Sequence, residues 1–366
     1  MQLDFTPDQE NLRDSVRAVL AKECPTTLVR AHVDHVVRGE PSTAGADLYR
    51  TLAALDWPAL TVPESDGGVG LGVIELAILA EELGRVIAPG PLLPTVAGFV
   101  PVLREAGGAS WLKAVASGEI AGSLAAADSG GAWAPDAVSA HVDGDGRLTG
   151  AKRYVLAVDD IDELAVVVRD GDGFAIVIVP KADLSIVPIR SLDASRSIGH
   201  VTLDGVRVAA ERRLPVESEA IERATAEATV AFALELVGTC QSIFDTTLEY
   251  AKERHQFGVP IGSFQAVKHK LANMFVAIER ARAVALFAAA TIEEDDPRRP
   301  MATAMAKAAA GECQRLVASD GIQLLGGIGF TWEHDQHLFV KRAKATDALF
   351  GSAAEHRAIV ADLLGI

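Results

Sequence analysis

The spacing of apolar residues changes twice along this chain of 366 residues. Up to about residue 115, apolar side chains recur every three or four residues, which is typical of amphipathic helices. From about residue 118 to 214, short β-branched runs alternate with DG, GDG and GR turns, as in ELAVVVRDGDGFAIVIVP and GHVTLDGVRV. Helical spacing then returns and persists to residue 366. This order predicts an α+β fold in which a β domain is inserted between two helical regions.

Local signals place several helices. Thr6 is a suitable N-cap ahead of Pro7, which fits the first position of a helix. Pro58 ends a second helix in DLYRTLAALDW, and a Gly-rich turn precedes an apolar helix in VIELAILAEELGRV that stops before Pro89. Long helices near 221–255, 264–290, 301–324 and 334–364 would form an antiparallel four-helix bundle. The predicted domains are therefore residues 1–115, 116–214 and 215–366.

Composition argues against several classes of function. A net charge of -16 disfavours a nucleic-acid-binding surface, because phosphates need clustered Lys and Arg, and 5% aromatic residues disfavour base stacking. Apolar runs fall short of the roughly 20 residues of a membrane span, and the acidic start lacks the features of a signal peptide. Cys24, Cys240 and Cys313 fit neither a zinc site nor a disulfide framework. We expect a cytoplasmic protein with no nucleic acid and no membrane span.

The first motif that carries chemistry is ERHQFGVPIGSFQ, residues 253–265. Arg254 at a helix end, a Pro-containing turn, and then Phe264 and Gln265 at the start of a new helix offer a guanidinium and helix-N-terminal amides to one anion. A pyrophosphate would suit this arrangement. Taken alone, the plainer interpretation is favoured, in which Arg254 caps a helix and Phe257 and Phe264 are core residues.

The second motif is QLLGGIGF, residues 323–330. Paired Gly326 and Gly327 allow a ligand or another backbone to come close, and Gln323 supplies both a donor and an acceptor. A single GGxG is weak evidence, because most such turns are helix C-caps. The two motifs together favour a binding site.

In these motifs and several further segments, the chain resembles the acyl-CoA dehydrogenase family over essentially its whole length. The matching pieces are DFTPDQENLRDSV, VPESDGGVGLGVIELAILAEELG, LTGAKRYV, VTLDGVRV, YAKERHQFGVPIGSFQAVKHKLANM and QLLGGIGF. The resemblance implies a helical N-terminal domain, a middle β-barrel, a C-terminal four-helix bundle, and FAD bound across a subunit interface. It implies α,β-desaturation of an acyl-CoA thioester: a carboxylate removes the α-proton, the β-hydrogen leaves as hydride to the flavin, and an electron-transfer flavoprotein accepts the electrons.

The resemblance carries one half of the FAD site over intact. The positions that match the family's adenosine and pyrophosphate contacts are Arg254, Phe257, Phe264, Gln265, Gln323, Gly326 and Gly327. In the family these residues serve a flavin whose ring lies in the neighbouring subunit.

The flavin-ring half departs from the family pattern. Where members carry Thr-Glu-Pro, small residues and Ser, this chain has LAAADSGGAWAP, and its polar or aromatic candidates are Ser123, Asp128, Ser129 and Trp133. Further on, an aromatic residue followed by a hydroxyl residue is replaced by Tyr154-Val155-Leu156, so that Tyr154 can stack but the hydroxyl is absent.

The catalytic base is missing from both of its family positions. The Glu of the usual Tyr-Glu-Gly is Phe350, and the alternative position on the first bundle helix is Ala228. Glu227 is rotated from it by about 100°, and we expect it on a solvated helix face. Glu235, in the apolar run VAFALELVG, is a weak candidate base, and a salt bridge to a neighbouring helix is the favoured interpretation.

The histidines carry little signal. His334 and His337 are three residues apart and could bind a metal, but no second ligand cluster accompanies them, so a polar face or an interface is favoured. His269 and His356 are expected in packing or surface roles, and EEDDPRR, residues 293–299, as a solvated loop.

Three functional hypotheses follow. The favoured one is the non-catalytic small subunit of a heteromeric (α2β2) acyl-CoA dehydrogenase of the sterol side-chain or pimeloyl type, in which a homologous catalytic subunit supplies the Glu and the flavin-ring half. The alternatives are a self-sufficient, homo-oligomeric dehydrogenase with a relocated carboxylate, and a flavin oxidase or monooxygenase on the same fold. A flavin-free structural protein is disfavoured by Arg254 and Gln323. The identity of the acyl group stays open.

Overall fold

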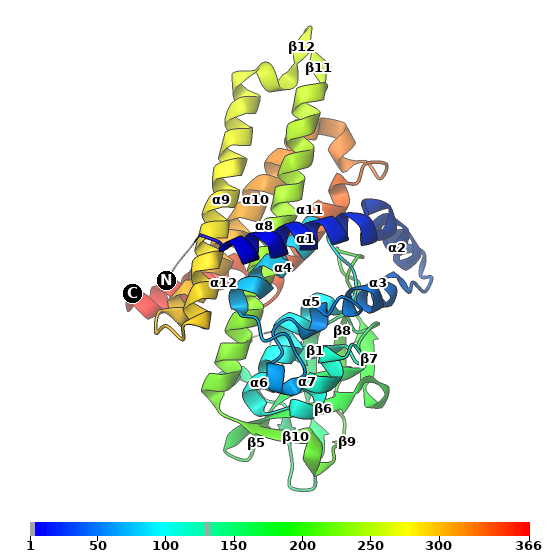
Figure 1. Ribbon diagram of the computed structural model, residues 1–366, viewed down its shortest axis with the longest axis vertical. Helices are drawn as coiled ribbons and strands as arrows, with labels where there is room; N and C mark the ends of the chain where they lie inside the picture. Colours follow the sequence, from blue (N-terminus) through cyan, green and yellow to red (C-terminus); the bar gives the residue numbers. More distant parts are fainter. Residues whose placement is uncertain (1–3, 129–130, 132) are drawn as a thin grey trace. The chain divides into compact units, whose positions relative to one another are not determined.

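A computed structural model of the chain describes residues 4–128, 131 and 133–366 (Figure 1). The chain forms two compact units, each built from separate stretches of sequence. The helical unit comprises Met1–Arg38, Ala77–Ala88 and Thr229–Ile366, and the mixed unit comprises Gly39–Leu76 and Pro89–Ala228. Helices α4 and α8 each begin in the mixed unit and end in the helical unit. The division into three consecutive domains stays a prediction.

The mixed unit contains two sheets. A seven-stranded sheet has the order β10-β6-β5-β2-β3-β9, with β1 paired in parallel to β5, and a three-stranded sheet has the order β4-β8-β7. The strands are β1 (Gly122–Ala125), β2 (His141–Val142), β3 (Arg147–Thr149), β4 (Ala151–Leu156), β5 (Glu163–Asp170), β6 (Gly173–Pro180), β7 (Ser185–Pro188), β8 (Ile198–Thr202), β9 (Val206–Arg207) and β10 (Arg213–Val216).

Short helices complete the mixed unit: α3 (Ala44–Ala53), η1 (Trp57–Ala59), η2 (Glu64–Asp66), α5 (Leu92–Pro94), η3 (Thr95–Phe99), α6 (Val100–Ala106), α7 (Ala109–Ala116), η4 (Pro135–Ala137), η5 (Lys181–Asp183) and η6 (Ala210–Arg212). The predicted hairpin ELAVVVRDGDGFAIVIVP is confirmed as β5 and β6. Alternate residues of β5 enter different cores, because Val167 packs with Phe99 under α6 and α7 whereas Val166 packs with Val155. A strand covered on both faces must be apolar throughout, which explains this continuous run.

The helical unit is built from long helices. They are α1 (Pro7–Glu23), α2 (Thr26–Arg38), α4 (Val73–Arg85), α8 (Ser218–Glu253), α9 (Gln265–Glu293), α10 (Arg299–Leu325), α11 (Gln336–Ala348) and α12 (Ala353–Leu364). The two-residue strands β11 (His255–Gln256) and β12 (Val259–Pro260) and the turn η7 (Ile261–Ser263) connect α8 to α9, and η8 (Gly326–Phe330) follows α10. Thr6 caps α1 through a capping box with Gln9, as predicted.

The predicted helix over 334–364 is wrong in one respect, because the structure divides it into α11 and α12. Phe350 and Gly351 between them have φ of 55° and 94°, in the left-handed region that ends a helix. Ser352 then starts α12 through a capping box with Glu355. Helix α10 packs along α9 and α12, and the four-helix bundle stays a prediction.

Two glycines let α4 and α8 cross in the helical unit. A Cβ atom at Gly84 would lie 2.0 Å from the Glu235 carbonyl oxygen, and one at Gly238 would lie 1.9 Å from that of Glu81. Thr239 Oγ1 donates to the Gly84 carbonyl at 3.1 Å, so the close contact is also hydrogen bonded. Only glycine permits this separation of the two helix backbones.

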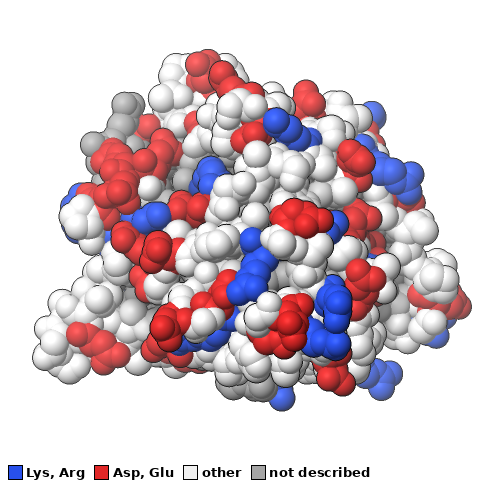
Figure 2. Space-filling view, turned by 90° about the horizontal axis from the view of Figure 1, so that it is seen from below, with Lys and Arg blue, Asp and Glu red and all other residues white. Residues whose placement is uncertain are grey.

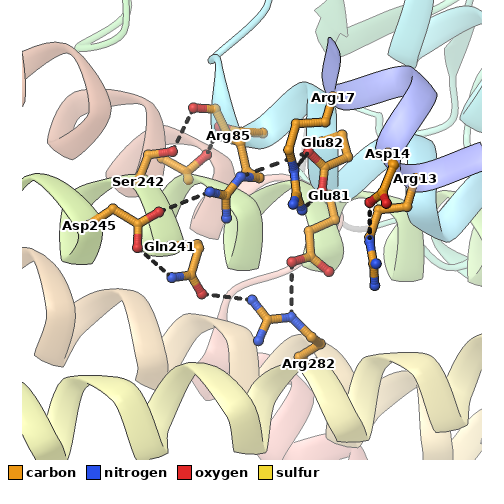
Figure 3. A network of polar contacts seen from close by, with 12 residues as sticks. Arg13, Asp14, Arg17, Glu81, Glu82, Arg85, Gln241, Ser242, Asp245 and Arg282 are labelled. Atoms are coloured by element: carbon orange, nitrogen blue, oxygen red, sulfur yellow. Dashed lines mark hydrogen bonds and ion pairs between the residues drawn. The ribbon is translucent and has the colours of Figure 1, made fainter. Parts of the chain in front are cut away.

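A polar network surrounds this crossing (Figure 3). Glu82 accepts from Arg17 Nε at 2.9 Å and from Nη2 at 2.6 Å, and Arg282 of α9 donates to Glu81 at 2.9 Å. Arg85 pairs with Asp245 at 2.9 Å. Burial raises the pKa of Glu81 even though Arg282 opposes the shift. These contacts join α1, α4, α8 and α9 around buried charges that each have an opposite partner.

The face drawn in Figure 2 carries acidic and basic side chains interspersed, without a continuous area of Lys and Arg. None of the helices in the described ranges combines the length and the hydropathy of a membrane-crossing segment. The three cysteines are free and buried.

Candidate functional site

The first motif lies where α8 ends and α9 begins. The Arg254 amide donates to the Tyr250 carbonyl at 2.8 Å, closing the last turn of α8, and the Arg254 carbonyl accepts from the Ile261 amide at 2.8 Å. A Cβ atom at Gly262 would lie 2.9 Å from the Ala251 carbonyl oxygen, so η7 packs directly against α8. Arg254 is therefore held beside the first turn of α9.

Two phenylalanines of this motif lie at the surface. Phe257 is 92% exposed and has φ of 54°, in the hairpin between β11 and β12. Phe264, the N-cap of α9, is 38% exposed and meets the Phe257 ring edge-to-face at 6.1 Å between centroids. The alternative in which Phe257 is a core residue is wrong, since a core ring would be covered by its own chain.

The polar groups of the motif are open. Arg254 and Gln265 are exposed, and within residues 4–128, 131 and 133–366 neither side chain has a hydrogen bond or ion pair. Phe264 cannot cap the first amides of α9 with its side chain. An unpaired guanidinium beside uncapped helix amides suits an anion.

The second motif follows the last turn of α10. Gly326 has φ of 65° and ψ of -143°, a conformation that is essentially restricted to glycine. A Cβ atom at Gly326 or Gly327 would meet nothing within 4 Å, so packing inside this chain does not require either glycine. Gln323 is exposed as well. The two glycines leave an open backbone that a ligand can approach.

An ion pair joins the two motifs. Lys270 of α9 pairs with Asp320 of α10, and these residues lie five positions after Gln265 and three before Gln323. Both motifs therefore lie at one end of the helical unit, and we call their seven predicted residues the nucleotide surface: Arg254, Phe257, Phe264, Gln265, Gln323, Gly326 and Gly327. A free guanidinium, open amides, exposed rings and bare glycines fit the adenosine and pyrophosphate of FAD.

In the mixed unit, the Asp128 side chain forms contacts with neighbouring residues of the same unit. Its carboxylate pairs with the fully buried Lys152 and accepts from the Ser139 hydroxyl at 2.7 Å and the Ala140 amide at 2.8 Å. Burial would raise the pKa of Asp128, but the bonds from Lys152 and Ser139 outweigh it, and the pKa lies below its usual value. Ser123 is buried on β1, and Ser129 lies outside the described residues.

Tyr154 is already stacked. Its φ is 58°, it is 37% exposed, and the Trp133 ring stacks on it at 6.4 Å and 25° between planes. The His200 ring lies 6.1 Å away on a tilted plane. Leu156 is buried and offers no hydroxyl. Trp133 and Tyr154, both predicted for the flavin ring, thus contact each other.

The family base positions are apolar. Phe350 is 5% exposed and stacks on Phe232 at 5.1 Å and 29°. Ala228 is fully buried and lies one turn before Phe232 on α8. Neither position offers a proton acceptor.

Glu235 forms a buried ion pair, which was its favoured interpretation. Its Oε1 lies 2.8 Å from Arg342 Nη1, with both side chains at most 2% exposed, and Thr346 Oγ1 lies 3.4 Å from its Oε2. Arg342 also donates to the Ala88 carbonyl at 3.3 Å. A carboxylate held in this way balances a buried cation.

The solvated position predicted for Glu227 is wrong. Glu227 is 2% exposed and lies 2.5 Å from Arg104 of α6 within the mixed unit. Helical spacing indicates which residues share a face, but it does not reveal that a cation from a distant segment lies opposite.

Lys307 was missed by the sequence analysis. It is fully buried and donates to the Asp347 carbonyl at 2.6 Å and to the Gly351 carbonyl at 2.7 Å. Burial lowers its pKa to about 8. His356 Nε2 lies 2.8 Å from the Phe350 carbonyl. These two side chains hold the turn that carries Phe350, and the only signal was a lone cation in the alanine-rich run MAKAAAG.

The other histidines are held by local contacts or exposed. His337 stacks on Trp332 at 4.6 Å between centroids, and His334 Nδ1 accepts from the Gln336 amide at 3.0 Å. His269 is exposed on α9. Throughout the described part of the chain, no group of three or more His, Cys, Asp or Glu residues is arranged to hold a metal ion.

Comparison with known proteins shows which family the chain belongs to. Residues 6–119 match the acyl-CoA dehydrogenase N-terminal domain and residues 219–365 match the acyl-CoA dehydrogenase C-terminal domain. Acyl-CoA dehydrogenase IpdE2 of Mycobacterium tuberculosis is 33% identical over 357 residues, which cover 96% of each chain.

Solved structures show the same fold over the whole chain. A chain of the ChsE4-ChsE5 complex from Mycobacterium tuberculosis superposes with a TM-score of 0.90 at 25% identity, covering 100% of this chain and 99% of that one. A steroid acyl-CoA dehydrogenase, Tcur3481-Tcur3483, has a TM-score of 0.86 at 28% identity, covering 98% of each. The chain belongs to the acyl-CoA dehydrogenase family and is an FAD-dependent oxidoreductase of that family.

Proposed function

We propose that this chain supplies the adenosine and pyrophosphate half of an FAD site to a homologous catalytic subunit of an acyl-CoA dehydrogenase. The observation that carries the proposal is a contrast between two groups of residues. The nucleotide surface is exposed and its polar side chains are open, whereas Phe350 at the family base position is stacked on Phe232.

Each part of the nucleotide surface has a separate task. Arg254 would pair with the pyrophosphate, and the first amides of α9 would add hydrogen bonds, as helix N-termini do for phosphates. Phe257 and Phe264 present ring surface to the adenine, and Gly326 and Gly327 let the dinucleotide lie against the backbone. Bound FAD supplies the hydride acceptor for the β-hydrogen.

Glu235 and Glu227 of α8 do not suit removal of an α-proton. This step needs a carboxylate that can approach the substrate. Glu235 is paired with Arg342 and Glu227 with Arg104, and both carboxylates are buried. The Glu that performs this step would therefore come from the catalytic subunit.

The mixed unit supports the same assignment. Trp133 covers one face of Tyr154, Leu156 has no hydroxyl, and Asp128 is engaged by Lys152. A flavin ring could stack on that face of Tyr154 only by displacing the Trp133 ring. The ring half of the site is accordingly assigned to the catalytic subunit.

The relatives indicate the assembly and the substrate class. The ChsE4-ChsE5 structure is a complex and the Tcur3481-Tcur3483 protein is a steroid acyl-CoA dehydrogenase. We assign this chain to an α2β2 assembly that acts on a steroid-type acyl-CoA and transfers electrons to an electron-transfer flavoprotein. Residues 1–115, 116–214 and 215–366 would form its helical domain, β-barrel and four-helix bundle.

Purification of the tagged full chain from its native host tests this proposal. Mass spectrometry should identify a homologous partner with a Glu at one of the two base positions, and the complex should contain one FAD per copy of this chain. The chain expressed alone should contain no FAD. Stoichiometric FAD in the lone chain, reducible by an acyl-CoA, would show a self-sufficient enzyme instead.

A further inference from the structure

We propose that Lys270 and Asp320 are a positioning pair that sets the distance between the two strips of the nucleotide surface and thereby the affinity for FAD. One strip is Arg254 with the start of α9, and the other is Gln323 with the glycines of η8. The inference rests on the function proposed above and assigns a task to two residues that would not touch the cofactor.

The pair lies within about two helical turns of both strips of the surface that it would control. Lys270 is five positions after Gln265 on α9, and Asp320 is three positions before Gln323 on α10. The Asp320 side chain is 13% exposed and that of Lys270 is 40% exposed. The carboxylate is mostly withdrawn from water, so its cation is needed to balance the charge.

Small residues make up most of what α9 and α10 bury, apart from larger ones such as Leu271 and Met274 of α9. These helices pack side by side (Figure 1), and their buried residues are mainly small. On α9 they include Ala277, Ala281, Ala285 and Ala288, and on α10 they include Ala302, Ala306 and Ala310. Alanine ridges are shallow, so two such helices can slide or rotate with a small loss of packing. A partly buried pair of this kind can fix the register of two helices.

The end of α10 is anchored to α8 by different contacts. A Cβ atom at Gly321 would lie 2.8 Å from Ile243 Cγ2 of α8 and 3.2 Å from Gln336 Nε2 of α11, so this part of α10 packs closely on both helices. Asp320 therefore projects toward α9 from a fixed helix end. Lys270 is the group through which α9 is held to that end.

A second ion pair between the same helices offers a matched control. Arg280 of α9 lies 3.6 Å from Glu312 of α10, which also pairs with Arg357 of α12 at 2.8 Å, and all three side chains are well exposed. Arg280 is ten positions after Lys270, about 15 Å farther along α9 at 1.5 Å per residue. Removing it disturbs the same interface away from the nucleotide surface.

The test measures FAD release from the assembly that co-purifies with the tagged full chain. Lys270→Met, Asp320→Asn and the double variant are compared with Arg280→Met and Glu312→Gln, and the melting temperature of each flavin-free assembly is recorded. We expect roughly tenfold faster release from the first three, as for residues that orient a binding group, and near-unchanged release from the two controls. The double variant should release FAD no faster than either single variant, because each single change already breaks the ion pair.

Two further variants separate the possible failures. Arg254→Gln reports on the proposed function, and Lys270→Arg, which keeps the charge, should retain FAD. If Arg254→Gln releases FAD and Lys270→Met behaves as Arg280→Met does, the positioning role is wrong and the proposed function stands. If Arg254→Gln also retains FAD, the proposed function fails. If the rate of FAD release instead correlates with the melting temperature across all variants, controls included, the positioning role is wrong and the pair is a general stabilising contact.

Discussion

At the scale of single residues, surroundings decide what a carboxylate can do. Glu235 lies in an apolar run and faces Arg342, so its charge is used inside the fold. Asp160 is also withdrawn from water, with its carboxylate against Gly45 at the start of α3. Burial raises its pKa, and the charge of Lys181 opposes this shift only in part. The two residues lead to different predictions.

Glu235→Gln should lower the free energy of unfolding by about 3 kcal/mol, because the Arg342 guanidinium would stay buried without its carboxylate. Denaturant unfolding of the full chain measures this loss. Glu249→Gln on the same helix removes an exposed pair with Lys252 and should change stability by less than about 1 kcal/mol. A Glu235→Gln protein with unchanged stability but abolished turnover in the assembly would identify Glu235 as a base.

Asp160→Asn should stabilise the protein at neutral pH. Burial, and then repulsion from Asp159, raises the pKa of Asp160 from 3.8 to about 6. Between these two values the folded state binds more protons than the unfolded state, so stability falls as pH rises through this window. Above it the variant should exceed the wild type by about 2 kcal/mol, and below pH 3.8 the difference should vanish. Denaturant unfolding at several pH values checks this. Asp172→Asn, in an exposed turn, should show no such window.

The residue-level predictions from sequence succeeded where a residue's chemistry was decisive. An unpaired carboxylate in VAFALELVG is costly, so an ion pair could be predicted for Glu235, although Arg342 could not be named. The solvated position predicted for Glu227 was wrong because its partner, Arg104, comes from a segment more than one hundred residues earlier. The role of Lys307 was missed for the same reason, since its acceptors are backbone carbonyls of a turn forty residues away.

At the scale of elements, the close crossing of α4 and α8 carries the sharpest prediction. Gly238→Ala should destabilise the protein by about 3 kcal/mol, because its Cβ atom would lie 1.9 Å from the Glu81 carbonyl oxygen and force the helices apart. Thermal and denaturant unfolding measure the loss. Gly144→Ala, where nothing lies within 4 Å, should stay within about 0.5 kcal/mol of the wild type. Equal effects at both glycines would contradict the tight crossing.

Most elements could be predicted from local signals. The Thr6 cap, the β5–β6 hairpin and the long helices follow from capping, turn and spacing rules. The break between α11 and α12 was missed because the helical spacing continues across it. The signal was present in Ser352-Ala-Ala-Glu355, a capping-box sequence directly after Gly351.

At the scale of the whole molecule, the two units differ in whether their predicted FAD-binding residues are open to a ligand. The helical unit presents an open nucleotide surface, while the stack of Phe350 on Phe232 replaces the base that family members place there. In the mixed unit, Trp133 and Tyr154, which were predicted for the flavin ring, stack on each other, and Asp128 pairs with Lys152. The presence of each motif could be read from the sequence. Whether each motif is open or already occupied depended on contacts between distant segments.

The measurement that tests the central claim most directly is anaerobic reduction of flavin by a steroid-type acyl-CoA. The full chain, purified alone and supplied with FAD, is compared with the same chain assembled with its Glu-bearing partner. The account predicts no bleaching of the flavin band with the lone chain and full bleaching with the assembly. Bleaching by the lone chain would contradict it.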